Sequence, residues 1–298
     1  MSKNVLKTAV LTAVMAAAVG LTGCSSTGGM QLTTSLSPEF MAKVVAEATT
    51  YDKSHSFAWN ITKVMNIEEN FKDAYLDEKE YNEAQSSSKL GWYTGATLLT
   101  GNPFDLGSMI YLFAPTVTNI AENPVYLGYY PKDKAQDERT AFRAFEQQIL
   151  DAYEAAATEM GFKNTGYKLA LHFERPETGG SITLKLKLRG GRLVKLAYDT
   201  NIPEWISNGK EQVWAVGASP TAQLGMKSLD VLDGGIFEAN KSRKLRGELM
   251  ERVAKHLPDH AFMFVPSMRN EKGDRTPAYV ADNKQKYFFV MPKSAQAK

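Results

Sequence analysis

The feature that most constrains the fold of this chain is a change of hydrophobic period near residue 161. Residues 137–161, "DERTAFRAFEQQILDAYEAAATEMG", place Phe142, Phe145 and Ile149 at helical spacing and end in a glycine. The stretches that follow, "YKLALHFE", "SITLKLKL" and "RLVKLAYD", alternate apolar and polar residues instead. The first pattern predicts an amphipathic helix that stops at Gly161, and the second predicts strands. Together they favour a fold that packs helices on a sheet.

Glycine turns connect the predicted strands. "ETGG" lies between residues 167–174 and 181–188, and "RGGR" lies between 181–188 and 192–199. Turns of this kind join neighbouring antiparallel strands, so an antiparallel meander is predicted. Every second residue from Ile182 to Leu188 is expected to face the core, while the lysines between them face water.

The remaining predicted elements place helices early in the chain and strands late. Helices are predicted over 37–51, with Ser37 as the cap and Pro38 at the first position, over 67–83 and over 242–257. Further strands are predicted over 211–219, 261–267, 276–281 and 286–291. Because strands and helices do not alternate, the prediction is an α+β fold, with N-terminal helices followed by a mainly antiparallel sheet with packed helices.

The amino-terminal stretch has the three-part pattern of a secretory signal peptide. Lys3 and Lys7 are its only charges, residues 8–23 are uncharged and rich in alanine, and small residues precede Cys24. The apolar run is too short for an ordinary membrane span, which needs about 20 strongly apolar residues. Residues 1–23 are therefore predicted to be a signal peptide.

The end of this stretch, Leu21-Thr22-Gly23-Cys24, resembles the lipobox of bacterial lipoproteins, and the resemblance covers only residues 1–25. It implies that the Cys24 thiol receives a diacylglycerol, that the chain is cut before it, and that the new amino terminus is acylated. Ser25, where an Asp favours inner-membrane retention, implies sorting to the outer membrane. Cys24 is the only cysteine, and the alternative is an inert thiol in an ordinary signal peptide or core helix.

The mature chain is predicted to begin with a lipidated flexible tether, residues 24–37. A mainly helical region, 38–131, would follow and then an α+β domain, 132–298, with one continuous domain as the alternative. Removing Lys3 and Lys7 lowers Lys+Arg from 35 to 33 against 33 Asp+Glu, so the formal net charge falls from +2 to 0. A neutral chain has no general attraction for phosphates, so no nucleic acid partner is expected.

Residues 90–131 contain no Lys or Arg and are rich in apolar residues. Gly101, Asn102, Pro103 and Asp105 interrupt the stretch, so it is not predicted to span a membrane. Its aromatic residues are the candidates for binding a partner or dipping into a membrane. The alternative is a segment packed in the core. These candidates are Trp92, Tyr93, Phe104, Tyr111 and Phe113.

A basic cluster begins the predicted helix near residue 242. It consists of Lys241, Arg243, Lys244 and Arg246. Such a cluster is a candidate for contact with acidic lipid headgroups, lipopolysaccharide phosphates or an acidic partner. The alternative is a solvated helix face, partly balanced by neighbouring glutamates.

Catalytic and metal-binding patterns are weak throughout the chain. Ser86 and Lys89 match a Ser-x-x-Lys spacing, but the partner motifs of serine penicillin-binding enzymes are missing. His256, Asp259 and His260 are spaced for a metal, but Pro258 interrupts the helix that would align them. No catalytic residue, metal or cofactor is therefore predicted.

The sequence predicts an outer-membrane lipoprotein, anchored through Cys24, whose α+β domain faces the periplasm. Its expected role is non-enzymatic: a binding or scaffold component of an envelope assembly, with an envelope protein as partner. An envelope hydrolase acting on peptidoglycan or lipid is one alternative. A carrier of an apolar ligand is another alternative. Such a carrier is expected to have an internal cavity lined by aromatic residues.

Overall fold

A computed structural model describes a large part of the chain after residue 37. The described residues are 38–68, 71–89, 123–166, 171–175, 177, 179–189, 197–207, 209, 211–217, 223–232, 239–269 and 275–295. They belong to one compact unit, Ser37–Lys298. Cys24 and the predicted interface aromatics (Trp92, Tyr93, Phe104, Tyr111 and Phe113) lie outside the described residues.

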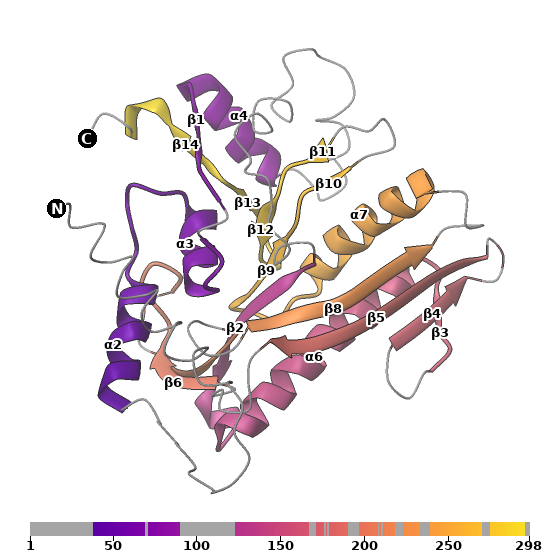
Figure 1. Ribbon diagram of the computed structural model, residues 1–298, viewed down its shortest axis with the longest axis horizontal. Helices are drawn as coiled ribbons and strands as arrows, with labels where there is room; N and C mark the ends of the chain where they lie inside the picture. Colours follow the sequence, from indigo (N-terminus) through magenta and orange to yellow (C-terminus); the bar gives the residue numbers. More distant parts are fainter. Residues whose placement is uncertain are drawn as a thin grey trace, which may run out of the picture. The chain divides into compact units, whose positions relative to one another are not determined.

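A ten-stranded antiparallel sheet organises this unit (Figure 1). Its order is β13 (Lys286–Phe288), β12 (Tyr279–Ala281), β9 (Ala261–Val265), β2 (Val125–Pro131), β8 (Gln223–Leu232), β5 (Gly180–Arg189), β4 (Leu171–Arg175) and β3 (Lys163–Asn164). The sheet forks at β2, because the first residues of β2 pair with β8 while its last residues pair with β7 (Gln212–Val216). β6 (Ala197–Asn201) pairs with the other edge of β7.

Two long helices cover one face of the sheet. α6 (Glu138–Glu159) and α7 (Ala239–Lys255) lie alongside β5 and β8 in Figure 1. Phe145, Ile149 and Tyr153 of α6 pack in one buried cluster with residues of β4 and β5. Asp137 caps α6 by accepting a hydrogen bond from the Thr140 N–H (2.8 Å), which satisfies a free donor of the first turn. The predicted helix over 137–161 is confirmed.

Shorter helices cover the other face. α2 (Pro38–Thr49) and α3 (Phe57–Val64) contribute Val45, Ile61 and Val64 to a second buried cluster, which contains Leu127, Tyr129 and Phe264 of the sheet. Neighbouring residues of β2 therefore point into different clusters, Tyr126 toward α6 and Leu127 toward α3. The predicted α+β class is confirmed: helices pack on a mainly antiparallel sheet.

The predicted helix over 67–83 is wrong in its first half. Residues 74–76 form a short strand, β1 (Ala74–Leu76), parallel to β14 (Val290–Pro292), and the Ala74 N–H donates to the Phe289 carbonyl (2.8 Å). The helix, α4, spans Glu78–Lys89 instead. It begins there because Asp77 and Glu80 form a capping box, each side chain accepting from the other's N–H (2.9 and 3.1 Å).

The predicted meander is correct for its first turn only. β4 and β5 pair directly, but β5 then pairs with β8, and β6 pairs with β7. Ile182 and Leu184 are buried as predicted, and the pairing of β5 with β8 shifts register between Lys185 and Leu186. Four small elements remain. η4 (Lys132–Lys134) and η5 (Lys293–Ala295) are short 3-10 helices. β10 (Met268–Arg269) pairs with β11 (Arg275–Thr276).

Candidate functional site

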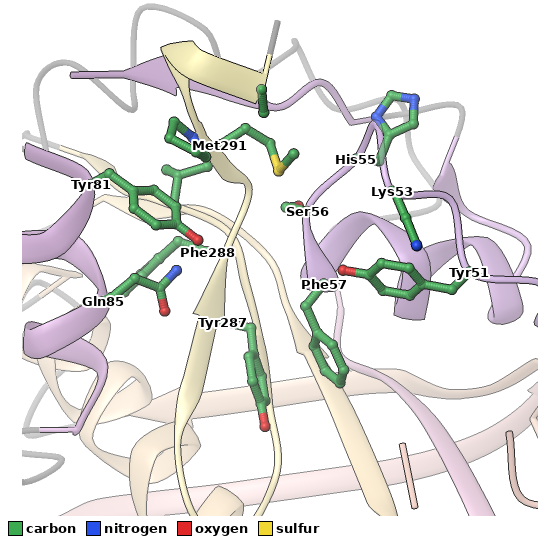
Figure 2. Close-up of a pocket in the computed structure, with 13 residues that line it drawn as sticks. Tyr51, Lys53, His55, Ser56, Phe57, Tyr81, Gln85, Tyr287, Phe288 and Met291 are labelled. Carbon is green, nitrogen blue, oxygen red and sulfur yellow. The ribbon is translucent and has the colours of Figure 1, made fainter. Parts of the chain in front are cut away.

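A cleft of about 410 Å³ lies where the amino-terminal and carboxy-terminal parts of the described chain meet. One wall is α4, which contributes Tyr81 and Gln85, and the other wall is the segment 51–57 (Figure 2). The segment from Tyr287 to Pro292, which includes β14, completes the lining together with Ala295. The volume lies in the range of small-molecule sites, which is about 300–1,000 Å³.

The cleft is lined mainly by aromatic and aliphatic side chains. Phe57 packs on Tyr287, with ring centroids 4.3 Å apart, and also contacts the edge of Trp205. Trp205 supports the wall from behind: its ring lies 5.2 Å from that of Tyr51, and its indole N–H donates to the Thr49 carbonyl (2.7 Å). These rings fix one another, so the wall presents a firm aromatic surface to the cleft.

Two phenol groups face each other across the cleft. Tyr51 and Tyr81 come from opposite walls, and their hydroxyls point inward in Figure 2. Burial raises the pKa of Tyr51, and the nearby Tyr81, Asp73 and Asp52 raise it further. Both side chains are half-buried, and among the described residues neither hydroxyl has a hydrogen-bond partner. Each hydroxyl therefore remains able to bond to a ligand.

A buried carboxylate fixes the wall formed by residues 51–57. The Asp73 side chain, which is 1% exposed, accepts hydrogen bonds from His55 Nδ1–H (3.0 Å) and the Ser56 N–H (2.9 Å), and also from the Ser56 hydroxyl. Ser56 in turn caps α3 by accepting from the Trp59 N–H (3.1 Å). The imidazole of His55 stacks on Trp59, with centroids 3.8 Å apart. Asp73 thus links β1 to the start of α3.

Asn60 holds the same wall from inside α3. Its side chain accepts from the Asp52 N–H (2.7 Å) and donates to the Asp52 carbonyl (3.0 Å), while it also donates to the Ser56 carbonyl (2.9 Å). Asn60 is 1% exposed, so these bonds are shielded from water. Buried polar groups of this kind specify a single local structure when all of them are satisfied.

The charges that line the cleft are basic. Lys53 is exposed, and the described residues that line the cleft include no carboxylate side chain. His55 lies at the rim, and its Nε2 has no hydrogen-bond partner among the described residues. The described lining therefore offers positive charge, from Lys53, to an anionic group of a ligand.

The predicted basic cluster lies in the first turns of α7. Of its members, Lys241, Arg243 and Lys244 have side chains outside the described set. Arg246 is half-buried and donates to the Asn123 side chain (3.3 Å). Arg246 therefore faces the protein rather than the solvent alone, and its role as an anionic-surface residue remains a prediction.

The candidate catalytic groups are not brought together where they are described. His256 contacts Glu159 of α6 (2.8 Å), whereas Asp259 accepts from the Asn283 side chain (3.1 Å). Ser86 and Lys89 lie in the last turn of α4, and their side chains are outside the described set. Within the described part of the chain, no three His, Cys, Asp or Glu side chains are grouped to hold a metal ion. Among the helices that the structure describes, none is both long enough and apolar enough to cross a membrane.

Comparison of the chain with models of protein families, with curated proteins and with solved structures found no match. Any function proposed for this chain therefore depends on the chemistry of its own residues. Sequence reasoning did not single out Tyr51, Tyr81 or Tyr287, because the three are far apart in the chain and lie in no motif. The one local signal nearby is the capping box at Asp77 and Glu80, which marks the start of α4.

Proposed function

We propose that this protein is an outer-membrane lipoprotein that acts as a binding component of the cell envelope, with its ligand held in the cleft between α4 and residues 51–57. The domain faces the periplasm and is tethered through lipidated Cys24. The observation that carries the binding role is the pair of inward-pointing hydroxyls of Tyr51 and Tyr81, neither of which has a hydrogen-bond partner among the described residues. A cleft with an apolar lining and a few convergent polar groups is typical of ligand sites.

The anchor is supported by the order of residue types at the amino terminus. A basic start, an uncharged run and Leu21-Thr22-Gly23-Cys24 occur together, followed by small polar residues. A thiol is the side chain that such alkylation requires. Three acyl chains would hold the protein far more firmly than a single chain, which binds membranes only marginally.

Binding is favoured over hydrolysis by the geometry of the cleft. The one Asp–His pair nearby, Asp73 and His55, shares its carboxylate with Ser56, and the Ser56 hydroxyl is used to cap α3. The Ser56 hydroxyl therefore bonds to Asp73 rather than to His55, so the described cleft residues do not form the serine–histidine pair of a hydrolase. The aromatic lining also favours a carrier of an apolar ligand, but the cleft has polar groups that a purely apolar ligand leaves unsatisfied.

Mass spectrometry of the mature amino terminus, isolated from separated inner and outer membranes, tests the anchor. Wild type is expected to carry an acylated Cys24 in the outer-membrane fraction, and Cys24→Ser is expected to lack acylation and to leave that fraction. Cys24→Ser remaining in the outer membrane would contradict anchoring by this residue. An unmodified amino terminus in wild type would overturn the lipoprotein assignment.

A further inference from the structure

We propose that the cleft binds a carbohydrate, with the sugar hydroxyls held between Tyr51 and Tyr81 and the sugar ring packed on the neighbouring aromatic side chains. This inference rests on the proposed function, because it names the ligand class of the same cleft. It follows from the types of group that face the cleft and from those that do not.

The opposed hydroxyls match the chemistry of alcohol groups. A phenol hydroxyl donates one hydrogen bond and accepts others, so it pairs with a sugar hydroxyl in either direction. Tyr51 and Tyr81 come from different walls of the cleft, and both hydroxyls point into it (Figure 2). A ligand between them with hydroxyls on two sides satisfies both phenols at once.

The aromatic rings supply the second half of the recognition. Phe57 and Tyr287 are half-buried, and their rings lie 4.3 Å apart with an interplanar angle of 34°. The C–H faces of a pyranose ring are apolar and flat, so they pack on aromatic side chains while the hydroxyls point outward to polar groups. The cleft offers both kinds of surface within one lining.

An acyl chain fits this lining less well. Enclosing the Tyr51 and Tyr81 hydroxyls against hydrocarbon would remove them from water without a new partner. A polar group buried in that way is strongly unfavourable compared with one that is hydrogen-bonded. A sugar avoids this penalty because its hydroxyls replace the water that the phenols lose.

An extended peptide also fits less well. Peptides that add to a sheet need a free strand edge. β14 is paired with β1, and α4 packs against both β13 and β14. One edge of β14 is thus already paired, so the strand offers a peptide fewer free backbone groups than an open sheet edge would.

Isothermal titration of the mature lipoprotein in lipid nanodiscs with chitotetraose, a β-1,4-linked tetramer of N-acetylglucosamine, tests the inference. Tyr51→Phe and Tyr81→Phe keep the rings and remove only the hydroxyls. Each is expected to weaken binding about three- to tenfold, the effect of losing one neutral hydrogen bond. Tyr130→Phe is the matched control, because Tyr130 packs near α6 on the other face of the sheet, and it is expected to leave the affinity unchanged.

Sodium laurate, titrated in the same way, separates the two proposals. Binding of laurate without chitotetraose, abolished by Phe57→Ala, would overturn the carbohydrate inference and support the binding role of the cleft. If neither Tyr51→Phe nor Tyr81→Phe changed the affinity for chitotetraose, the proposed hydrogen bonds from Tyr51 and Tyr81 to the sugar would be overturned. Failure of both probes to bind would count against the carbohydrate and against the cleft as a ligand site.

Discussion

The two faces of the sheet satisfy their phenols in different ways. On the face covered by α6 and α7, the buried hydroxyls of Tyr126 and Tyr153 pair with each other (2.6 Å). On the opposite face, the buried hydroxyls of Tyr129 and Tyr198 have no hydrogen-bond partner within the described part of the chain. Both of these residues lie opposite Ala215 of the strand between them, so they share one face.

We propose that the two faces of the sheet have different roles, one in stability and the other in binding. The α6–α7 face is closely packed, to the point that a side chain at Gly128 would overlap the Phe145 ring. The other face is covered by the shorter α2 and α3, and the cleft adjoins it through Phe57 and Tyr287. We infer that the α6–α7 face maintains the fold, whereas ligand recognition belongs to the cleft beside the α2–α3 side, which Tyr51 and Tyr81 line and Tyr129 and Tyr198 do not.

The largest effect is expected where β2 and the segment after β7 approach most closely. In Gly217→Ala, the new Cβ would lie 2.1 Å from the Tyr126 carbonyl oxygen, at a φ of +78°. We expect the free energy of unfolding to fall by more than about 3 kcal/mol, since backbone cannot move aside cheaply. Gly179→Ala is the matched control: its φ is +70° but nothing lies within 4 Å, so the cost should be about 1–2 kcal/mol. Equal losses in urea titrations would contradict the close approach.

Truncating an apolar side chain should cost more on the α6–α7 face than at the cleft. Ile149 is fully buried, and Ile149→Ala is expected to lower the free energy of unfolding by about 3 kcal/mol. Phe57 is half-buried, and Phe57→Ala is expected to cost about 1–2 kcal/mol. Chemical denaturation measures both values. A larger loss for Phe57→Ala would reverse the proposed division between the faces.

Asp73 should contribute to stability although it lies beside the cleft. Asp73→Ala leaves the donors of His55 and Ser56 without their acceptor, so we expect a loss of about 2–3 kcal/mol. Asp259→Ala, at an exposed carboxylate, serves as the control and should change stability by less than about 0.5 kcal/mol. A thermal or urea unfolding curve for Asp73→Ala that matches wild type would show that residues 51–57 do not depend on this carboxylate.

The smallest effects concern single hydroxyls and should differ in sign. Tyr126→Phe removes the partner of a buried hydroxyl and is expected to destabilise the protein by about 1–2 kcal/mol. Tyr198→Phe removes an unsatisfied hydroxyl and is expected to be neutral or to stabilise by up to about 1 kcal/mol. Paired urea titrations measure the difference. A loss in Tyr198→Phe as large as in Tyr126→Phe would show that both hydroxyls are satisfied.

The sequence predicted the elements that have one solvated face. The helix over 137–161 shows a clear apolar stripe, because only one side of α6 contacts the sheet. β2, "VYLGYYP", was missed because both of its faces are covered, so its residues are apolar or aromatic without alternation. The error over 67–76 has a different cause: pairing with β14, more than 200 residues away, overrides local helix propensity there.

The cleft could not be predicted from the sequence, because the segments that line it are also far apart in the chain. Its lining comes from residues 51–57, from α4 and from the last strands, and no local pattern indicates that these segments meet. The positions of Tyr51 and Tyr81 depend on Asp73, Asn60 and the Asp77 cap, each of which acts through tertiary contacts or a short local motif. The proposed lipobox, by contrast, is a contiguous motif, so the sequence alone is enough to propose it.

Hydrogen–deuterium exchange of the protein, with and without chitotetraose, tests the division between the faces most directly. We expect the ligand to slow exchange in residues 51–64 and in α4, which form or adjoin the two walls of the cleft, and to leave α6 unchanged. Protection centred on α6 and α7, with none in residues 51–64 or α4, would contradict the assignment of binding to the cleft.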